Sequence, residues 1–548
     1  MSSDSVEEPK KTARAAKAAS VPDSGATSVE AVVDSDLAKQ AEAVRERVAK
    51  ASAEKVVPHL RIDERERNGR VARANVPRED LGTWVAPADR QDPVDILVAQ
   101  EDSRVKELVP VRHARMATSA FAFYRGGAAV MAADLAVTPR TGLKAQLCGD
   151  AHLSNFGLFA APDRSVVFDV NDFDETHPGP FEWDVKRLAT SFVLAARDNG
   201  IADSIGLEAA MGSAAAYRES MADFAQRREL DIWYDRINVD ELLNSLSNSL
   251  LEGEGKKGAD AKVKAKAQAA ITQAVAKARL RDAWSAIAKI TEVVDGQRQF
   301  LSQPPLLTRL DLGQELRATI NSLFREYRAT LQDDRQELLK RYEIIDMGHK
   351  VVGVGSVGLL AFVILLRGRD DDDLMVLQVK QAQASVLEKY THKSTFNKHG
   401  HRVVTGQRLM QAASDSFLGW IDGPGGRSFY IRQLRDMKWS PDPASLDEKR
   451  LRRYARLCGH TLARAHARSG DAIALSAYMG TGKSFDKAIG AFSMAYADQV
   501  ALDFAAFTSA IADGRLDSHE TMDGAEGTTA AQHIAAATKQ ARATRKKG

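Results

Sequence analysis

The sequence of 548 residues lacks several features that mark particular classes of protein. It has only two cysteines, Cys148 and Cys458, which are too few for a disulfide framework and lack the paired spacing of a zinc site. It has almost no net charge, since 76 Lys and Arg residues oppose 74 Asp and Glu residues to give +2. A dedicated nucleic-acid binder draws its affinity from a one-sided basic surface, so we expect no nucleic-acid partner.

Long hydrophobic runs are also missing. The longest uncharged stretch, Val351 to Leu366, is shorter than the roughly 20 apolar residues that span a bilayer, and it contains three glycines. Residues 1–50 carry Lys, Glu and Asp throughout, without the apolar segment of a secretory signal. We therefore expect a cytoplasmic protein with no membrane partner.

Aromatic residues are absent from residues 1–60, which consist mostly of Ala, Ser, Val, Lys, Glu and Asp. Such a composition cannot offset the entropy lost on ordering, so we predict a disordered arm. Residues 516–548 are again rich in Ala, Thr, Gln and Lys, and we predict a frayed tail there.

Two regions between these ends carry residues suited to chemistry. In the first, LCGDAHLSNFG at residues 147–157, Asp150 stands five residues before Asn155, and a short apolar strand predicted over residues 166–170 leads into further acids. Phosphoryl transfer needs an Asp that accepts a hydroxyl proton, and an Asn and another Asp that hold magnesium. We predict that Asp150 is the base and that Asn155 is both a catalytic and a metal-binding residue. The candidate metal ligands are Asn155, Asp169, Asp172 and Asp174.

A simpler alternative is that these polar residues cap turns and line a solvated loop. We favour the catalytic interpretation because several like charges beside a buried strand are costly unless a cation or a partner compensates them.

The second region, VVGVGSVG at residues 351–358, has the pattern G-x-G-x-x-G, which occurs in both dinucleotide-binding and kinase-type loops. A dinucleotide-binding fingerprint opens a helix, whereas the apolar residues 359–366 predict a strand. A turn and another strand follow, and this strand ends in Lys380, which could reach ATP phosphates beneath a glycine-rich loop. The candidate ATP-binding residues are Gly353, Gly355, Ser356, Gly358 and Lys380, and Lys380 is also a catalytic candidate.

Two alternatives stay open for this region. Asp370 to Asp373, downstream of the glycines, are compatible with a dinucleotide-binding oxidoreductase. Lys380 is also compatible with an ordinary surface lysine at the end of a strand.

Further elements complete the expected nucleotide site. Residues 401–411 predict a helix, and residues 417–420 and 428–434 predict two strands, so this region is typical of a small ATP-holding sheet. A helix residue should pair with Lys380, and Glu388 and Gln407 are the candidates. Arg125, in FAFYRGG, is a candidate to reach a phosphate or an acidic substrate. Residues 451–469 predict an amphipathic helix.

Four segments of the sequence, FAFYRGGAAVMAADLA, CGDAHLSNFG, NDFDETHPGPFEWDVKRLATS and VVGVGSVG, resemble the bacterial family called domain of unknown function 2252 over most of residues 70–510. A more distant likeness connects the chain with aminoglycoside and choline phosphotransferases, whose loop reads H-G-D-x-H-x-x-N and whose metal strand reads I-D-F/W-x-D. Cys148 departs from the first His of that loop. The likeness implies that an acid within Glu182–Val185 steadies the catalytic loop, and that the LARAH segment at residues 462–466 corresponds to a helix that ordinarily precedes this loop.

The order of these motifs predicts an α+β fold that is protein-kinase-like, two-lobed and circularly permuted, with disordered termini. Permutation is physically reasonable because only spatial adjacency matters to a core. The expected parts are an arm over residues 1–60, a large helical lobe over 61–340, a small ATP-holding lobe over 341–438, helices that complete the large lobe over 439–515, and a tail over 516–548.

The function predicted from the sequence is a kinase-like phosphotransferase that depends on ATP and Mg²⁺ and has an unknown small-molecule or protein acceptor. Nucleotidyl (AMP) transfer on the same scaffold is an alternative, and so is a non-catalytic, nucleotide-binding pseudokinase. A dinucleotide-binding oxidoreductase is a weaker alternative.

Overall fold

The computed structural model describes residues 59–239, 287–304, 306–351, 357–434 and 439–519, and the single positions 269, 272, 273, 276 and 355. Contacts divide the chain into two units, Met1–Arg61 and Ile62–Gly548, and every element described below belongs to the second. Nearly all of the predicted arm and most of the predicted tail lie outside the described residues. The second unit mixes helices and sheets, so the predicted α+β class is confirmed.

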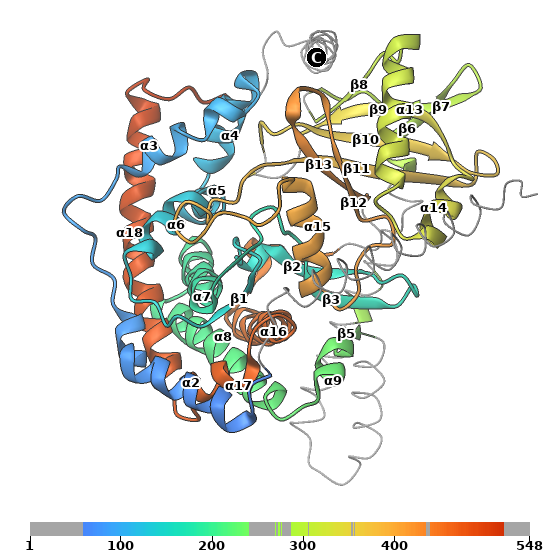
Figure 1. Cartoon of the computed structure of the whole chain (residues 1–548). Helices are drawn as coiled ribbons and strands as arrows, with labels where there is room; N and C mark the ends of the chain where they lie inside the picture. Colours follow the sequence, from blue (N-terminus) through green and yellow to red (C-terminus); the bar gives the residue numbers. More distant parts are fainter. Residues whose placement is uncertain are drawn as a thin grey trace, which may run out of the picture. The chain divides into compact units, whose positions relative to one another are not determined.

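One part of this unit is built from helices that come from both ends of the chain (Figure 1). These helices are α2 (Ile62–Asn75), α3 (Pro93–Val98), α4 (Val109–Met116), α5 (Ala120–Gly126), α6 (Ala128–Ala136), α7 (Phe181–Asp198), α8 (Asp203–Phe224), α9 (Glu229–Tyr234), α16 (Glu448–Ala467), α17 (Ala472–Met479) and α18 (Ser484–Ala512). Helix α2 packs against α17, and α8 packs against α16 and α18, so the two ends of the described chain share one apolar core.

Helix α16 shows how the sequence specifies this packing. Leu451, Cys458 and Leu462 recur at helical spacing and are all buried, and the side chain of Asp447 caps the first turn. The amphipathic helix predicted over residues 451–469 is confirmed, with α16 starting three residues earlier.

The other part is an antiparallel sheet (Figure 1) whose strands are, in spatial order, β12 (Gly419–Asp422), β13 (Ser428–Gln433), β11 (Leu374–Ala382), β10 (Ala361–Arg367), β9 (Glu343–Lys350) and β8 (Leu307–Arg309). Helix α13 (Gln314–Arg328) packs on the face that carries Phe362 and Val379. Because side chains alternate along a strand, Lys380 and its cross-strand partner Tyr430 point to the opposite face. Helix α14 (Asp333–Leu339) precedes β9, and α15 (His399–Met410) packs into the same core as Tyr430.

Short sheets bring two loops together. Strand β1 (Lys144–Leu147) pairs with β4 (His177–Pro180), and β2 (Phe156–Ala160) pairs with β3 (Val166–Val170), which also pairs with β5 (Ile237–Asn238). Residues 148–155 form a first loop, which runs from β1 to β2, and residues 171–176 form a second loop, which runs from β3 to β4. Because β1 pairs with β4 and β2 pairs with β3, the two loops lie side by side. The strand predicted over residues 166–170 is confirmed.

The structure also tests the local predictions around the glycines. A strand, β10, follows Gly358, so the helix that a dinucleotide-binding fingerprint requires is not present there. Strand β11, helix α15 and strands β12 and β13 also form where the sequence predicts them.

The region 203–340 contains α8, α9, α13 and α14 as expected, but also short strands that sequence analysis missed. They are β5, β8, and the hairpin of β6 (Thr291–Val294) with β7 (Gln297–Phe300). Strand β8 belongs to the large sheet, so the sheet begins before residue 341, where the small lobe was expected to start. Short 3₁₀ turns occur at Arg78–Gly82, Glu101–Ser103, Lys106–Leu108, Leu153–Asn155, Pro424–Gly426 and Pro443–Ser445. Among the described residues, no helix combines the length and the apolar character that crossing a membrane requires.

The closest approach between α8 and α16 gives a test of this packing. A Cβ atom on Gly459 of α16 would lie 2.1 Å from the carbonyl oxygen of Ser213 in α8. We expect Gly459→Ala to force the helices apart and to lower the free energy of unfolding by roughly 1–3 kcal/mol, measured by urea denaturation.

The matched control is Gly212→Ala in α8, where the new Cβ would meet only Cγ of Arg456 at 3.7 Å. This change should be neutral or stabilising by about 0.5–1 kcal/mol because glycine is a poor helix former. Equal effects of the two substitutions would contradict the close packing.

Candidate functional site

The loop between β1 and β2 is fixed to helix α7 by a buried carboxylate. Asp184 accepts the backbone N–H of Cys148 at 2.8 Å and that of Gly149 at 3.0 Å. Gly149 has φ +81°, and a Cβ there would lie 2.3 Å from the carbonyl oxygen of Glu175, so only glycine fits. Asp184 thus sets the position of the next residue, Asp150.

Asp184 is held in turn by the end of α16. His466 Nε2 lies 3.2 Å from Asp184 Oδ2, and His466 Nδ1 lies 2.9 Å from the hydroxyl of Tyr217 in α8. All three side chains are buried. Glu182, the other acid of this segment, instead accepts the backbone N–H of Thr141 at 2.9 Å. The acid expected within Glu182–Val185 to steady the loop therefore corresponds to Asp184.

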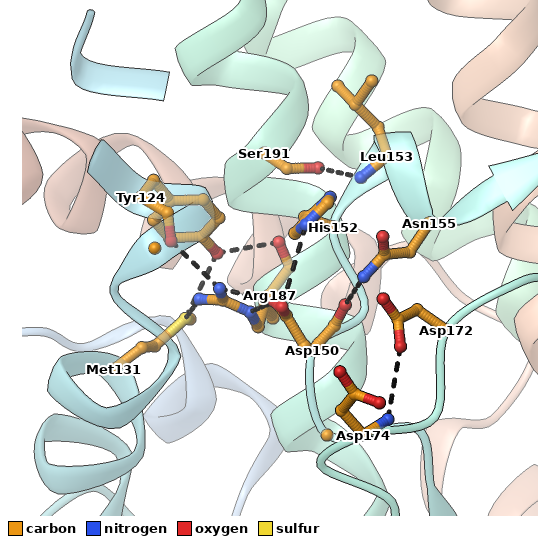
Figure 2. A network of polar contacts seen from close by, with 12 residues as sticks. Tyr124, Met131, Asp150, His152, Leu153, Asn155, Asp172, Asp174, Arg187 and Ser191 are labelled. Atoms are coloured by element: carbon orange, nitrogen blue, oxygen red, sulfur yellow. Dashed lines mark hydrogen bonds and ion pairs between the residues drawn. The ribbon is translucent and has the colours of Figure 1, made fainter. Parts of the chain in front are cut away.

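Asp150 is paired with an arginine that sequence analysis did not identify (Figure 2). Arg187 of α7 donates from Nε to Asp150 Oδ1 at 2.6 Å, and its Nη2 donates to the carbonyl oxygen of Tyr124 at 3.0 Å. Burial raises the pKa of Asp150, although the charge of Arg187 acts in the opposite direction. His152 Nε2 lies 3.7 Å from Asp150 Oδ2, and burial lowers the pKa of His152 far enough to keep the ring neutral at pH 7. The pKa of Asp150 is thus raised, as suits a group that accepts a proton.

The side chain of Asn155 forms a hydrogen bond within its own loop. Its side-chain Nδ2 donates to the backbone carbonyl oxygen of Asp150 at 2.7 Å. This bond orients the amide, and Figure 2 shows Asn155 and Asp172 beside Asp150, with Asp174 next to them. Asn155 is thus held against Asp150 within one loop, and Asp172 and Asp174 come from the neighbouring loop after β3.

The acidic loop after β3 meets the end of strand β11. Lys380 Nζ lies 3.9 Å from Asp172 Oδ2 and forms an ion pair with Asp174. The hydroxyl of Tyr430 donates to Asp174 Oδ1 at 2.7 Å. Burial opposes ionisation of Asp174, but the charge and hydrogen bond of Lys380 outweigh it and lower the pKa of this carboxyl group. The structure thus brings together Lys380, Asp172 and Asp174, which are more than 200 residues apart in the sequence.

Asp169 is placed differently from the other candidate metal ligands. Its side chain is 3% exposed and forms an ion pair with Arg464 of α16, and it also accepts the backbone N–H groups of Val170 and Ala412. The oxygens of Asp169, predicted as a metal ligand, are thus used here in joining β3 to α16. In this position the carboxylate stabilises the fold.

Neither candidate partner of Lys380 contacts it. Glu388 accepts the backbone N–H groups of Ser385 and Ser394, each at 3.2 Å. Gln407 of α15 donates to Gln411 at 3.0 Å. Both predictions are wrong, because the negative charges beside Lys380 come from the acidic loop rather than from a helix of the sheet part.

The two described glycines of the glycine-rich segment, Gly355 and Gly358, lie against residues that precede the loop of residues 148–155 in the sequence. Gly353 and Ser356 lie outside the described residues. A Cβ on Gly355 would lie 3.5 Å from the backbone oxygen of Arg125. Gly358 has φ +89°, and its carbonyl oxygen accepts the N–H of Val105 at 2.8 Å.

The backbone of Arg125 lies beside Gly355, and its guanidinium is close to Asp150 and Asp172. Its Nε is buried and makes no hydrogen bond within the described chain. Burial lowers the pKa of Arg125, while the charges of Asp150 and Asp172 raise it, so the guanidinium stands within electrostatic range of both acids. Arg104, which sequence analysis missed, donates to the carbonyl oxygen of Val357 at 2.5 Å.

A third missed arginine, Arg402 of α15, fixes the acidic loop. It donates to the carbonyl oxygen of Asp174 at 2.8 Å, to that of Gln383 at 2.7 Å and to that of Thr176. Residues such as Arg187 and Arg402 carry no local signal in the sequence, because their partners are loop atoms contributed by distant segments.

No group of three or more His, Cys, Asp or Glu side chains with metal-binding geometry occurs among the described residues. Mg²⁺ does not require such a group, because it is commonly bound through one or two carboxylates together with substrate phosphates. Asp172 and Asp174, with side chains 34% and 20% exposed, and the amide of Asn155 fit that donor set.

The chain belongs to the family described as an uncharacterized protein conserved in bacteria (DUF2252), whose family model matches residues 104–510. The resemblance to this family that the motifs indicated is thereby confirmed. The match includes the loop of residues 148–155, the acidic loop, Lys380 and α16. No curated protein and no solved structure matches the chain.

Glu175, next to Asp174, provides a test of burial at this site. Burial raises its pKa from the usual 4.5 to about 7, although the N–H of Val386 donates to its Oε2 at 2.7 Å. An acid with a raised pKa contributes stability that is complete below pH 4.5 and is lost as the pH rises through 7. We expect Glu175→Gln, which keeps an acceptor for Val386, to exceed the wild-type stability at pH 8 by up to roughly 3 kcal/mol.

The measurement is urea denaturation of both proteins between pH 4.5 and pH 8. The difference between them should shrink toward the acid end of this range. A difference that does not change with pH would show that Glu175 ionises as freely in the folded state as in the unfolded chain.

Proposed function

We propose that this protein is a kinase-like phosphotransferase that uses ATP and Mg²⁺. The observation that carries the proposal is the meeting of Lys380 with Asp172 and Asp174 beside the loop of Asp150 and Asn155. Phosphoryl transfer is achieved mainly by positioning and charge neutralisation, and these residues supply a cation for phosphate oxygens, oxygen donors for a metal and a base.

Each residue has a role in this proposal. Asp172, Asp174 and Asn155 would hold Mg²⁺, which neutralises phosphate charge when bound. Lys380 would turn from Asp174 toward the phosphates of ATP. Asp150 accepts the proton of the acceptor's hydroxyl group, and the hydroxyl oxygen bonds to the γ-phosphorus. At the same time the bond between the γ-phosphorus and the β–γ bridging oxygen breaks, and ADP leaves. Arg125, Gly355 and Gly358 would contact the phosphates in this proposal.

The proposed fold is a circularly permuted kinase-like fold, and the junction of α16 with β1 supports it. Ser469, just after α16, accepts the backbone N–H of Gln146 in β1 at 3.0 Å, although 323 residues separate the two. In the kinases that the chain resembles, the helix with the L-A-x-x-H segment runs directly into the catalytic loop. Here the corresponding helix ends beside β1 without a chain connection, as a permutation would require.

A second candidate is a nucleotide-binding pseudokinase, and two observations favour it. Among the residues that the structure describes, no helix glutamate pairs with Lys380, and the carboxylate of Asp150 is engaged by Arg187. Both contacts would reduce the capacity for transfer while leaving a site for ATP. Nucleotidyl transfer on the same scaffold would move the label of α-labelled ATP to the acceptor, whereas phosphoryl transfer would move the label of γ-labelled ATP.

The test combines ATP binding with transfer from γ- and α-labelled ATP to small-molecule and protein fractions of a bacterial lysate. We expect Asp150→Asn to keep ATP affinity but to lower transfer by at least about 100-fold, since a positioned base contributes that much or more. Lys380→Met should weaken ATP binding, and Asp172→Asn should reduce its dependence on Mg²⁺.

Two exposed residues serve as controls: Lys393→Met for the lysine and Asp311→Asn for the acids. Neither should change binding or transfer. Absence of ATP binding in the presence of Mg²⁺, or equal binding by Lys380→Met and Lys393→Met, would refute the proposal. Binding that is independent of Mg²⁺ and gives no turnover would establish the pseudokinase instead.

A further inference from the structure

The two aspartates proposed as metal ligands already have a cation beside them. The side chain of Lys380 is only 5% exposed, and its Nζ lies 3.9 Å from Asp172 Oδ2 and forms an ion pair with Asp174. Positive charges at such separations repel each other, and they do so more strongly where water is largely excluded. A divalent ion bound by both carboxylates would therefore meet the charge of Lys380 at close range.

The position of Asp174 does not depend on Lys380 alone. The hydroxyl of Tyr430 donates to Asp174 Oδ1 at 2.7 Å, and Arg402 donates to the backbone carbonyl oxygen of Asp174 at 2.8 Å. Asp172 Oδ1 accepts the backbone N–H of Asp174 at 3.3 Å. These bonds remain when the ammonium group moves away, so the two carboxylates stay together.

We propose that Lys380 is a built-in counter-ion that keeps divalent cations out of this site until ATP arrives. In the free protein the ammonium group already compensates the acids, and a metal ion alone would have to leave that charge buried without a partner. The phosphate oxygens of ATP offer the lysine a different anionic partner. When Lys380 turns to them, Asp172 and Asp174 become available to the ion that accompanies the phosphates. This inference rests on the proposed function and adds that the metal enters with the nucleotide.

The test measures binding of Mn²⁺, which accepts the same oxygen ligands as Mg²⁺ and is detected by electron paramagnetic resonance, to the full-length protein without nucleotide. We expect Lys380→Met to bind Mn²⁺ at least about tenfold more tightly than the wild type, because two carboxylates are left without their counter-charge. The double variant Lys380→Met, Asp172→Asn should lose this gain, which assigns the ion to these acids.

The matched control is Lys393→Met, which removes an exposed lysine and should bind Mn²⁺ as the wild type does. The proposal is overturned when Lys380→Met binds Mn²⁺ no more tightly than Lys393→Met, or when the double variant keeps the gain.

Because Lys380→Met leaves Asp174 without its ion-pair partner and could fail to fold, thermal denaturation of the wild type supplies a second measurement. A ligand raises the Tm of a fold that it binds. We expect Mn²⁺ alone to change the Tm of the wild type no more than that of Asp172→Asn, a variant that keeps the pair of Lys380 with Asp174. A rise in Tm that occurs in the wild type and not in Asp172→Asn would show that the metal enters without ATP, contrary to the proposal.

No nucleotide is present in these measurements, so they can fail while the proposed function holds. The proposed function fails separately, when the wild type does not bind ATP in the presence of Mg²⁺.

Discussion

Lys380 and Asp174 carry opposite charges at a place from which water is largely excluded, and neither charge is stable there without the other. Removing one partner of such a buried pair commonly costs roughly 3–5 kcal/mol, because the remaining charge stays uncompensated. Tyr430 and Arg402 add hydrogen bonds to the side chain and the backbone of Asp174. Since Lys380 belongs to the large sheet and Asp174 to a loop of the helical part, this pair fixes the two parts in register, and the remaining polar groups are arranged around it.

A second set of contacts explains how a loop so rich in polar atoms keeps one conformation. Asp184 accepts two backbone N–H groups of the loop of residues 148–155, His466 contacts Asp184, and Tyr217 contacts His466 from a further helix. These contributions come from positions scattered along the chain, yet they form one buried network whose hydrogen bonds are nearly all satisfied. The network depends on spatial neighbours and not on chain order, and this property is what makes a permuted arrangement of the same parts physically acceptable.

Much of this arrangement was predictable from the sequence, and the parts that were not share a physical reason. The strand over residues 166–170 and the helix containing Leu451 and Cys458 follow from local periodicity, which a single sequence records directly. Asp169 and Asp172 have similar neighbours in the sequence, and only the contact with Arg464, almost 300 residues away, distinguishes the surroundings of the two carboxylates. The arginines that bind the loops, and short edge strands such as β8, depend on tertiary contacts, so no local sequence pattern predicts them.

Strand β11 presents consecutive residues to two different surroundings, since Val379 faces the apolar core under α13 and Lys380 faces the acids. Close-packed interiors transmit displacement instead of absorbing it, so a change of packing on one side shifts the backbone that both residues share. Such coupling is reciprocal in free energy. The sheet is therefore a common wall between the two surroundings, and a substitution that repacks its apolar face under α13 would also move the strand that carries Lys380.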